Sequence, residues 1–318
     1  MDDRPEFRAL PFRPGGPPRS NWGFFGDEDE VGTLNLIKPG MVASAAALVR
    51  TGEVYPLNWD LERPSPALFD RKVLKHRIID LDPVGTEDVY DDFYPQASSQ
   101  WDALAHIKHP EHGYYNGRQR ADITGREGSR NGIDQWARRG IAGRFVLADI
   151  ESFRAQQGLV MRHNVRDAVS IEEIVACLAS VGVSAKVGDI LLIRFGWITW
   201  YERSDATVRA ELASTTFFPG PGLANEARTA EWLWDQGIAA VAADNPALEA
   251  QPFDESGEEG YLHYRLIPLL GMAVGELFAL DRLAAACAAD GRYTGLFVAA
   301  PLNKTGGSGS PANAVALR

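Results

Sequence analysis

Two segments of the sequence gather side chains that can bind a metal ion or move a proton. The first spans residues 96–106 and contains Asp102 and His106, and the second begins at His263 and ends at Glu276. Carboxylate oxygens and imidazole nitrogens are ligands for divalent metals, and imidazole also titrates near neutral pH. Glu276 follows an apolar stretch, where an ionised carboxylate is costly unless it is paired or bound to a metal. These residues therefore favour metal or acid–base chemistry.

The sequence motifs of several other enzyme classes are absent. The chain contains no G-x-G-x-x-G, Walker, H-E-x-x-H or G-x-S-x-G motif, which disfavours a Rossmann dehydrogenase, an NTPase and a serine hydrolase. Its two cysteines, Cys177 and Cys287, show neither CxxC nor zinc-ligand spacing. We therefore expect both of them to be small buried hydrophobic residues.

The two segments resemble the cyclase family typified by bacterial kynurenine formamidases. That family carries a His-x-x-x-His-x-Asp-x-x-x-His motif, then a distant His with a Glu twelve or thirteen residues later. Asp102 and His106 stand at the Asp and the last His of the motif, and His263 and Glu276 stand at the distant pair. The likeness extends from about Trp22 to Asn313 and includes the segments 139–143, 188–194 and 243–246.

The resemblance implies a ligand set, with one departure from the family pattern. In the family, the first two histidines and the Asp hold one metal, while the Asp, the distant His and the Glu hold a second. Here Gln96 and Gln100 stand at the first two histidine positions, and a glutamine oxygen is a weak, neutral ligand. We therefore expect one divalent metal, zinc or manganese, held by Asp102, His263 and Glu276.

The same resemblance implies a metal-dependent hydrolase. It would use a metal-activated water to open an amide, cyclic amide or lactone bond of a small molecule, with His106 as the catalytic residue that carries a proton to the leaving group. We expect Gln96, Gln100, Trp101 and Tyr115 to line the substrate pocket, the two aromatic residues as a wall for a flat substrate. Two alternatives stay open: a metal-dependent lyase, isomerase or cyclase of the same fold, and a metal-free binding protein.

The elements that would position these residues alternate between strands and helices. Buried strands are predicted at 145–150, 190–195, 238–243 and 296–300, and helices at 38–50, 171–181, 225–236 and 280–289. Such interleaving indicates an α/β domain. The family resemblance implies a mixed sheet with the swivelling β/β/α architecture of the cyclases. Residues 73–81 predict a further strand, while 83–130 predict a mostly irregular, functional loop.

The predicted domain covers residues 1–318 without an internal linker. Residues 1–22 are rich in proline and glycine and predict an extended arm laid on the body or on a partner subunit. Residues 303–318 predict a flexible tail, because they begin with a Gly/Ser-rich run. The resemblance also implies a homodimer or homotetramer, in which the arm could be exchanged between subunits.

Composition narrows the choice of partners and compartment. The chain has 32 basic and 43 acidic side chains and a formal charge of -11, which disfavours nucleic-acid binding. The first residues include no apolar signal region, and no run approaches the roughly 18 apolar residues of a transmembrane helix. We therefore expect a small-molecule substrate, no membrane partner and a cytoplasmic location.

Overall fold

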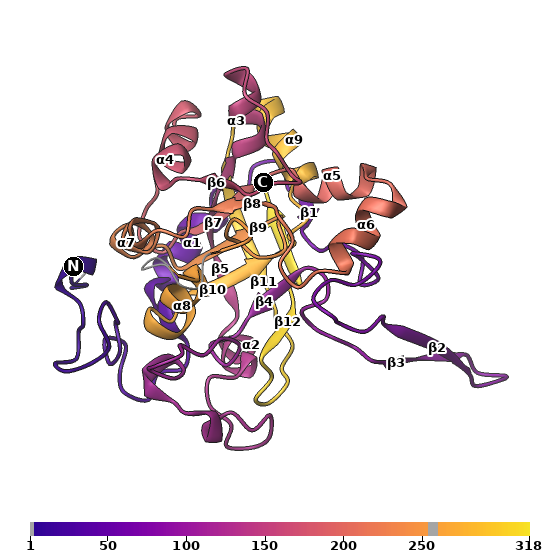
Figure 1. Cartoon of the computed structure of the whole chain (residues 1–318), viewed down its shortest axis with the longest axis horizontal. Coiled ribbons are helices and arrows are strands. Elements are labelled where there is room, and N and C mark those ends of the chain that lie inside the picture. The colour runs from indigo at the N-terminus through magenta and orange to yellow at the C-terminus, as the bar shows by residue number, and fades with distance from the viewer. Residues whose placement is uncertain (1–2, 254–259) are drawn as a thin grey trace.

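Figure 1 shows the computed structural model of the chain, which describes residues 3–253 and 260–318. The predicted α/β class is confirmed, because a mixed nine-stranded sheet lies at the centre with helices packed around it. Two smaller sheets pair β2 (Lys75–Asp80) with β3 (Thr86–Asp91), and β6 (Asp167–Val169) with β8 (Pro221–Leu223). Across the described ranges, none of the helices has the length and apolar character to cross a membrane.

The large sheet combines parallel and antiparallel strands. Its order is β1 (Val54–Pro56), β13 (Ala314–Leu317), β11 (Thr294–Ala299), β5 (Ile141–Asp149), β7 (Ile190–Arg194), β9 (Ala240–Ala243), β10 (Ala273–Glu276), β4 (Gln100–Asp102) and β12 (Gly309–Pro311). The central strands β5, β7, β9 and β10 are parallel. Every residue of β7, β9 and β10 is buried, as expected for strands covered on both faces. The four predicted buried strands correspond to β5, β7, β9 and β11.

The sheet is strongly curled. Although β12 and β13 lie near opposite ends of the strand order, only Ala312 and Asn313 separate them in the sequence. So short a connection spans roughly 10 Å, which draws the two ends of the sheet together. The rings of Trp101 on β4 and Phe297 on β11 accordingly lie 6.0 Å apart, although several strands separate them along the sheet.

The predicted flexible tail is wrong in its second half. Residues 309–311 and 314–317 form β12 and β13, and the side chain of Arg318 is buried against Asp290. Composition misled here because a Gly/Ser-rich run has low strand propensity by itself. Pairing with β4, β1 and β11 comes from the rest of the fold and overrides that preference.

Helices cover the sheet and its connecting loops. They are α1 (Pro39–Ala46), α2 (Ile133–Arg139), α3 (Ile150–Gln156), α4 (Ile171–Ser180), α5 (Trp197–Arg203), α6 (Ala206–Ala213), α7 (Ala227–Asp235), α8 (Leu262–Tyr264) and α9 (Asp281–Asp290). Short 3-10 turns add η1 (Phe7–Ala9), η2 (Gly32–Leu36), η3 (Tyr115–Gly117) and η4 (Arg120–Asp122), and a π-helical turn, η5 (Arg265–Leu269), follows α8. The predicted helices correspond to α1, α4, α7 and α9. Helix α4 begins at Ser170, whose side chain accepts the N–H of Glu173.

The N-terminal arm lies on the body of its own chain. Residues 1 and 2 of the predicted arm lie outside the described ranges. Further along the arm, Phe7, Leu10 and Trp22 are buried in the main core. The backbone N–H of Phe7 also donates to Asp235 at the end of α7, at 2.7 Å. Apolar burial therefore fixes a segment whose prolines prevent regular structure.

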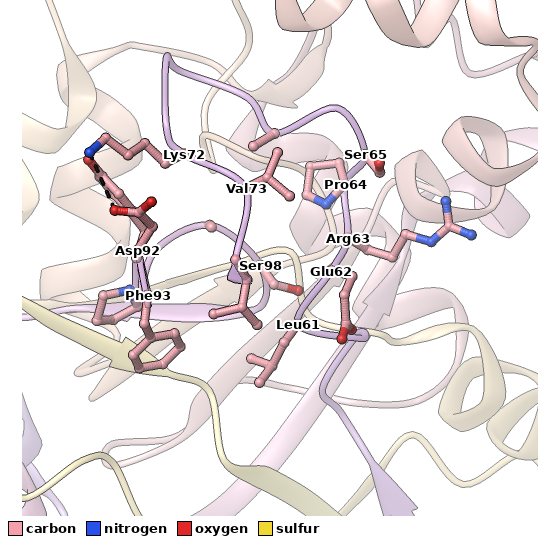
Figure 2. A pocket seen from close by; sticks show the side chains of 15 residues that line it. Leu61, Glu62, Arg63, Pro64, Ser65, Lys72, Val73, Asp92, Phe93 and Ser98 are labelled. Carbon is pink, nitrogen blue, oxygen red and sulfur yellow. Dashed lines mark hydrogen bonds and ion pairs between the residues drawn. The ribbon is translucent and has the colours of Figure 1, made fainter. Parts of the chain in front are cut away.

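The β2–β3 hairpin projects from the body (Figure 1), and its strands are almost wholly exposed. Strand β2 falls within the predicted strand 73–81, whereas β3 and β4 lie in the range predicted as irregular. At the hairpin base, Lys72 pairs with Asp92 at 3.3 Å, as the dashed line in Figure 2 shows. A hollow of ≈ 30 Å³ beside this pair has room for roughly one or two water molecules. It is too small for an organic substrate.

Candidate metal and active site

Strand β4 carries the first group of predicted site residues and pairs antiparallel with β10. In this register Gln100 lies opposite Glu276, and Asp102 lies opposite Val274. Successive side chains of a strand point to opposite faces. Gln100, Asp102 and Glu276 therefore share one face of the sheet, and Trp101 occupies the other.

His263 joins the two carboxylates from the short helix α8. Its Nε2 atom lies 3.1 Å from Oε1 of Glu276 and 3.7 Å from Oδ2 of Asp102. One ligand atom from each residue lies within 4.8 Å of the others, and all three side chains are buried. Two carboxylate oxygens and one imidazole nitrogen suit zinc or manganese. The structure thus brings the three predicted metal ligands together.

The cluster fits a divalent cation because its own charges are poorly balanced. Oδ2 of Asp102 is buried and has no hydrogen-bond partner among the described residues, which is costly for a carboxylate oxygen. Burial raises the pKa of Glu276 to about 7, and the charge of Asp102 adds to this shift. Burial also acts to raise the pKa of Asp102, but the charges of His106 and His263 lower it. A divalent ion would satisfy the open oxygen and replace the proton that Glu276 retains at neutral pH.

Glu249 holds His263 from the side away from the cluster. Its carboxylate accepts hydrogen bonds from Nδ1 of His263, from Nδ2 of Asn225 at 2.6 Å and from the backbone N–H of Leu262. Burial opposes a charge on His263, but Asp102 and Glu249 raise its pKa well above the usual range. A carboxylate on one ring nitrogen fixes the tautomer that leaves the other nitrogen free for a metal. The sequence analysis missed Glu249, because no motif position marks it.

The two glutamines contact other site residues and do not line the cavity described below. Nε2 of Gln100 donates to Oε2 of Glu276 and, at 3.3 Å, to Oδ1 of Asp102. Its amide therefore caps both carboxylates at a position where the family motif carries a histidine. Nε2 of Gln96 lies 3.3 Å from Nδ1 of His106. The expectation that Gln96 and Gln100 line the pocket is corrected: both support residues that do.

His106 reaches the cavity with a partly exposed ring. Its Nε2 atom lies 3.7 Å from Oδ1 of Asp102. With the amide of Gln96 donating to Nδ1, the neutral ring carries its proton on Nε2. Burial lowers the pKa of His106, so the ring is neutral near pH 7. An imidazole that is neutral near pH 7 can accept a proton and then, as an imidazolium, give it to a leaving group, so His106 is placed for proton transfer beside the cluster.

The predicted aromatic wall is wrong. Trp101 is fully buried and packs on Phe278 inside the curled sheet, with ring centroids 5.1 Å apart. Tyr115 is also fully buried, and its hydroxyl donates to Asp29 at 3.2 Å. For Trp101 the alternation of β4 is the reason, because a residue next to Asp102 on a strand must face the opposite side.

Other aromatic residues line the cavity that opens beside the cluster. This cavity has a volume of ≈ 170 Å³ and is lined by the three candidate ligands, by His106 and by the rings of Phe69, Phe217 and Tyr261. Tyr261 stacks on His263 with centroids 4.5 Å apart. The aromatic residues stand in loops without a recognisable motif, so the sequence offered no signal for them.

Comparisons with known proteins agree with this geometry. The Cyclase family model matches residues 37–250, more than half of the chain. A solved structure described as a novel cyclase is 31% identical, with a TM-score of 0.83 and coverage of 94% of this chain and 97% of that chain. None of the curated proteins compared with the chain matches it.

Two isatin hydrolases share the fold at lower identity. Isatin hydrolase A from Labrenzia aggregata is 18% identical, with a TM-score of 0.60 and coverage of 87% of this chain and 98% of that chain. Isatin hydrolase A from Ralstonia solanacearum is 19% identical, with a TM-score of 0.55 and coverage of 83% and 91%. Together with the family match, the motif residues on β4, α8 and β10 lead to one conclusion: the chain belongs to the cyclase family.

Proposed function

We propose that this protein is a metal-dependent hydrolase that opens an amide, cyclic amide or lactone bond in a small, ring-bearing substrate. One observation carries the proposal. Asp102, His263 and Glu276 form a buried cluster with an open carboxylate oxygen, and this cluster borders a cavity with aromatic walls. Such a donor set suits a single zinc or manganese ion, which when bound would polarise a carbonyl and lower the pKa of a water.

The residues around the cavity have three proposed roles: holding the ion, transferring a proton and orienting the ligands. Asp102, His263 and Glu276 hold the ion, and Glu249 keeps Nε2 of His263 directed at it. His106 takes up a proton from the attacking water and, as an imidazolium, gives it to the leaving nitrogen or oxygen when the scissile bond breaks. Gln100 fixes the orientation of both carboxylates through its amide hydrogens.

Structural relatives support the hydrolytic reading of the site. The isatin hydrolases that share the fold are named for an activity on isatin, a cyclic amide fused to an aromatic ring. One structure of an isatin hydrolase contains the product analogue thioisatinate. A cyclic amide of similar size would fit beside the aromatic residues of the cavity here.

The test combines metal analysis with a substrate panel. The protein is loaded separately with zinc and manganese and assayed on N-formyl aromatic amines, cyclic imides and lactones in ¹⁸O-labelled water. We expect one ion per chain and a product that contains solvent oxygen. Isomerisation or dehydration of a related keto compound without solvent oxygen would instead support the lyase alternative, and no metal after loading would support the binding protein.

A further inference from the structure

Arg71 is the one arginine or lysine among the described residues that line the site cavity. It lies in the loop before β2, and its side chain is half-buried. The chain as a whole is strongly acidic, with a formal charge of -11. A cation inside this cavity therefore adds a positive contribution to the local electrostatic potential, although the molecule as a whole is negatively charged.

The contacts of Arg71 leave part of its guanidinium free. Nη1 donates to the backbone oxygen of Gln96, and the guanidinium lies 5.0 Å from the centroid of the Phe69 ring. In the described part of the chain it forms no direct ion pair with Asp102 or Glu276, although the charges of both influence it. Its Nε and Nη2 atoms make no hydrogen bond to any of the residues that the structure describes. A guanidinium presents N–H donors in a planar fork that matches a carboxylate.

The backbone before Arg71 is held in an unusual conformation. Phe69 and Asp70 have φ values of 59° and 54°, a left-handed region that a bulky residue rarely adopts. This turn places Phe69 and Arg71 along the site cavity, whereas Lys72 and Val73 line the small hollow at the hairpin base (Figure 2). Strained backbone of this kind is characteristic of segments that hold a ligand-binding side chain.

With one divalent ion bound, the described lining of the cavity has no carboxylate left to balance the charge of Arg71. Asp102 and Glu276 carry two negative charges, which one divalent ion neutralises. Glu249 lies behind His263, where N–H donors already surround its carboxylate. The half-buried guanidinium of Arg71 then has no acidic partner in the described lining of the cavity, which favours an anionic group on the ligand.

We infer that Arg71 binds a carboxylate on the substrate, so that the substrate is a small aromatic amide or lactone with one anionic group. This inference rests on the proposed function and adds the substrate class. The cavity of ≈ 170 Å³ suits a single ring between Phe69 and Phe217, since about 150 Å³ suffices for benzene. Arg71 is thus a specificity-determining residue, with the scissile bond at the metal cluster and the carboxylate at the guanidinium.

The experiment separates the affinity contributed by a carboxylate on the ligand from the affinity contributed by metal binding. Benzohydroxamate and its 3-carboxy and 4-carboxy derivatives share the same metal-binding group, so any difference in affinity reports the added carboxylate. Isothermal titration calorimetry on zinc-loaded full-length chain compares wild type with Arg71→Met. Arg77→Met is the matched control, because Arg77 lies on the exposed hairpin and pairs with Asp91.

We expect at least one carboxylated probe to bind wild type and Arg77→Met roughly 10- to 100-fold more tightly than benzohydroxamate, the usual worth of a charge-assisted hydrogen bond. Arg71→Met should lose this preference while still binding benzohydroxamate. A preference that survives in Arg71→Met, or one that is absent from wild type, overturns the inference and leaves the proposed function standing. Failure of wild type to bind benzohydroxamate at all overturns both.

Discussion

Two clusters of buried charge lie at the carboxyl ends of the parallel strands, and they differ in what balances them. In the first, Arg194 ends β7 and pairs with Asp149 at the end of β5, at 2.9 Å, and with Asp281, at 2.7 Å. In the second, Glu276 ends β10 and lies beside Asp102, with no lysine or arginine paired directly to either among the described residues. The chain supplies the cation of the first cluster, and we propose that a metal supplies that of the second.

Two buried carboxylates, Asp244 and Glu276, show the same difference between the balanced and the unbalanced cluster. Burial raises the pKa of Asp244 to about 7, as it does for Glu276. Asp244, however, accepts three backbone N–H groups from residues 195–197, at 2.7, 2.8 and 3.1 Å. Among the described residues, Glu276 has only the amide of Gln100 and the ring of His263 as hydrogen-bond partners. Equally buried carboxylates therefore differ in their partners: Asp244 is held by backbone donors, whereas Glu276 is held by side chains and suits the role of a metal ligand.

Removing a ligand from the unbalanced cluster should have the largest effect. Asp102→Asn replaces a charged oxygen by a neutral, weaker ligand. We expect metal affinity to fall by more than roughly 100-fold, beyond the loss typical of a supporting residue, and hydrolysis to fall with it. Metal content after dialysis and calorimetric titration measure this. Asp281→Asn, in the balanced cluster, should retain the metal, and a metal that stays bound in Asp102→Asn would refute the ligand assignment.

The proton donor can be separated from the ligands. His106→Ala should lower turnover by roughly 10²- to 10⁴-fold, the usual contribution of general acid–base catalysis, while the metal content stays unchanged. Steady-state kinetics and elemental analysis of the same preparation give both values. His76→Ala, on the exposed hairpin, is the control. If the metal leaves together with the imidazole, His106 is a ligand.

Disrupting the balanced cluster should change stability but not metal binding. Arg194→Met leaves several acidic groups without their cation, and breaking a buried ion pair in this way costs about 3–5 kcal/mol. Urea denaturation should show this loss in the free energy of unfolding. The metal dissociation constant of the folded fraction should match that of wild type. A stability change below about 1 kcal/mol would show that the two clusters are less different than their contacts imply.

Removing the charge of Glu249, the carboxylate behind His263, should have an intermediate effect on metal affinity. Glu249→Gln keeps the shape of the side chain but removes the charge that fixes the imidazole tautomer. Metal affinity should fall by roughly 10- to 100-fold, as for other partners of ligand histidines. Competition with a chelator of known affinity measures it. Glu231→Gln, in an exposed pair with Arg8, should leave that affinity unchanged, and an equal loss in both variants would contradict the role of Glu249.

We expect the smallest effect at the end of α9, where the exposed Asp290 pairs with the buried Arg318. Slight burial acts to raise the pKa of Asp290, but hydrogen bonds from Arg318 and Arg292 lower it to about 2. The unfolded carboxyl titrates near about 3.9, so the pair stabilises the fold above that pH and loses its effect as pH falls from about 4 to about 2. Wild type should exceed Asp290→Asn by less than about 1 kcal/mol at pH 6. Denaturant titrations should show this gap closing in acid; a gap that widens would contradict the pairing.

The structure brings together the candidate ligands that the sequence singled out, because their spacing is local to each segment. Asp102 and His106 stand in one motif and His263 and Glu276 in another, and the structure places the four side chains around one cavity. Alternation along a strand would also have placed Trp101 correctly, had residues 100–102 been recognised as a strand. The apolar runs of β5, β7 and β9 were predicted for the same local reason.

What the sequence could not provide depends on contacts between distant segments. Glu249 becomes important only because α8 brings His263 against it. Arg71 enters the cavity only because the backbone at Phe69 and Asp70 turns into the left-handed region, for which neither residue is a signal. Residues 309–317 become strands only because both ends of the sheet need a partner. None of these contacts produces a recognisable pattern within a short stretch of the sequence.

The curled sheet has a consequence for how the protein is made. Strand β12 borders the ligand-bearing β4, and β13 joins β1 to β11 near the opposite end, so both ends of the sheet stay incomplete until residues 309–317 have been synthesised. A nascent chain that has not yet been extended beyond residue 308 lacks the segment that draws the two ends of the sheet together. Long-range pairing of this kind folds slowly and leaves unpaired edges exposed in the meantime. The proposed metal site on β4 is therefore completed only once residues 309–317 have been synthesised, long after Asp102 has emerged.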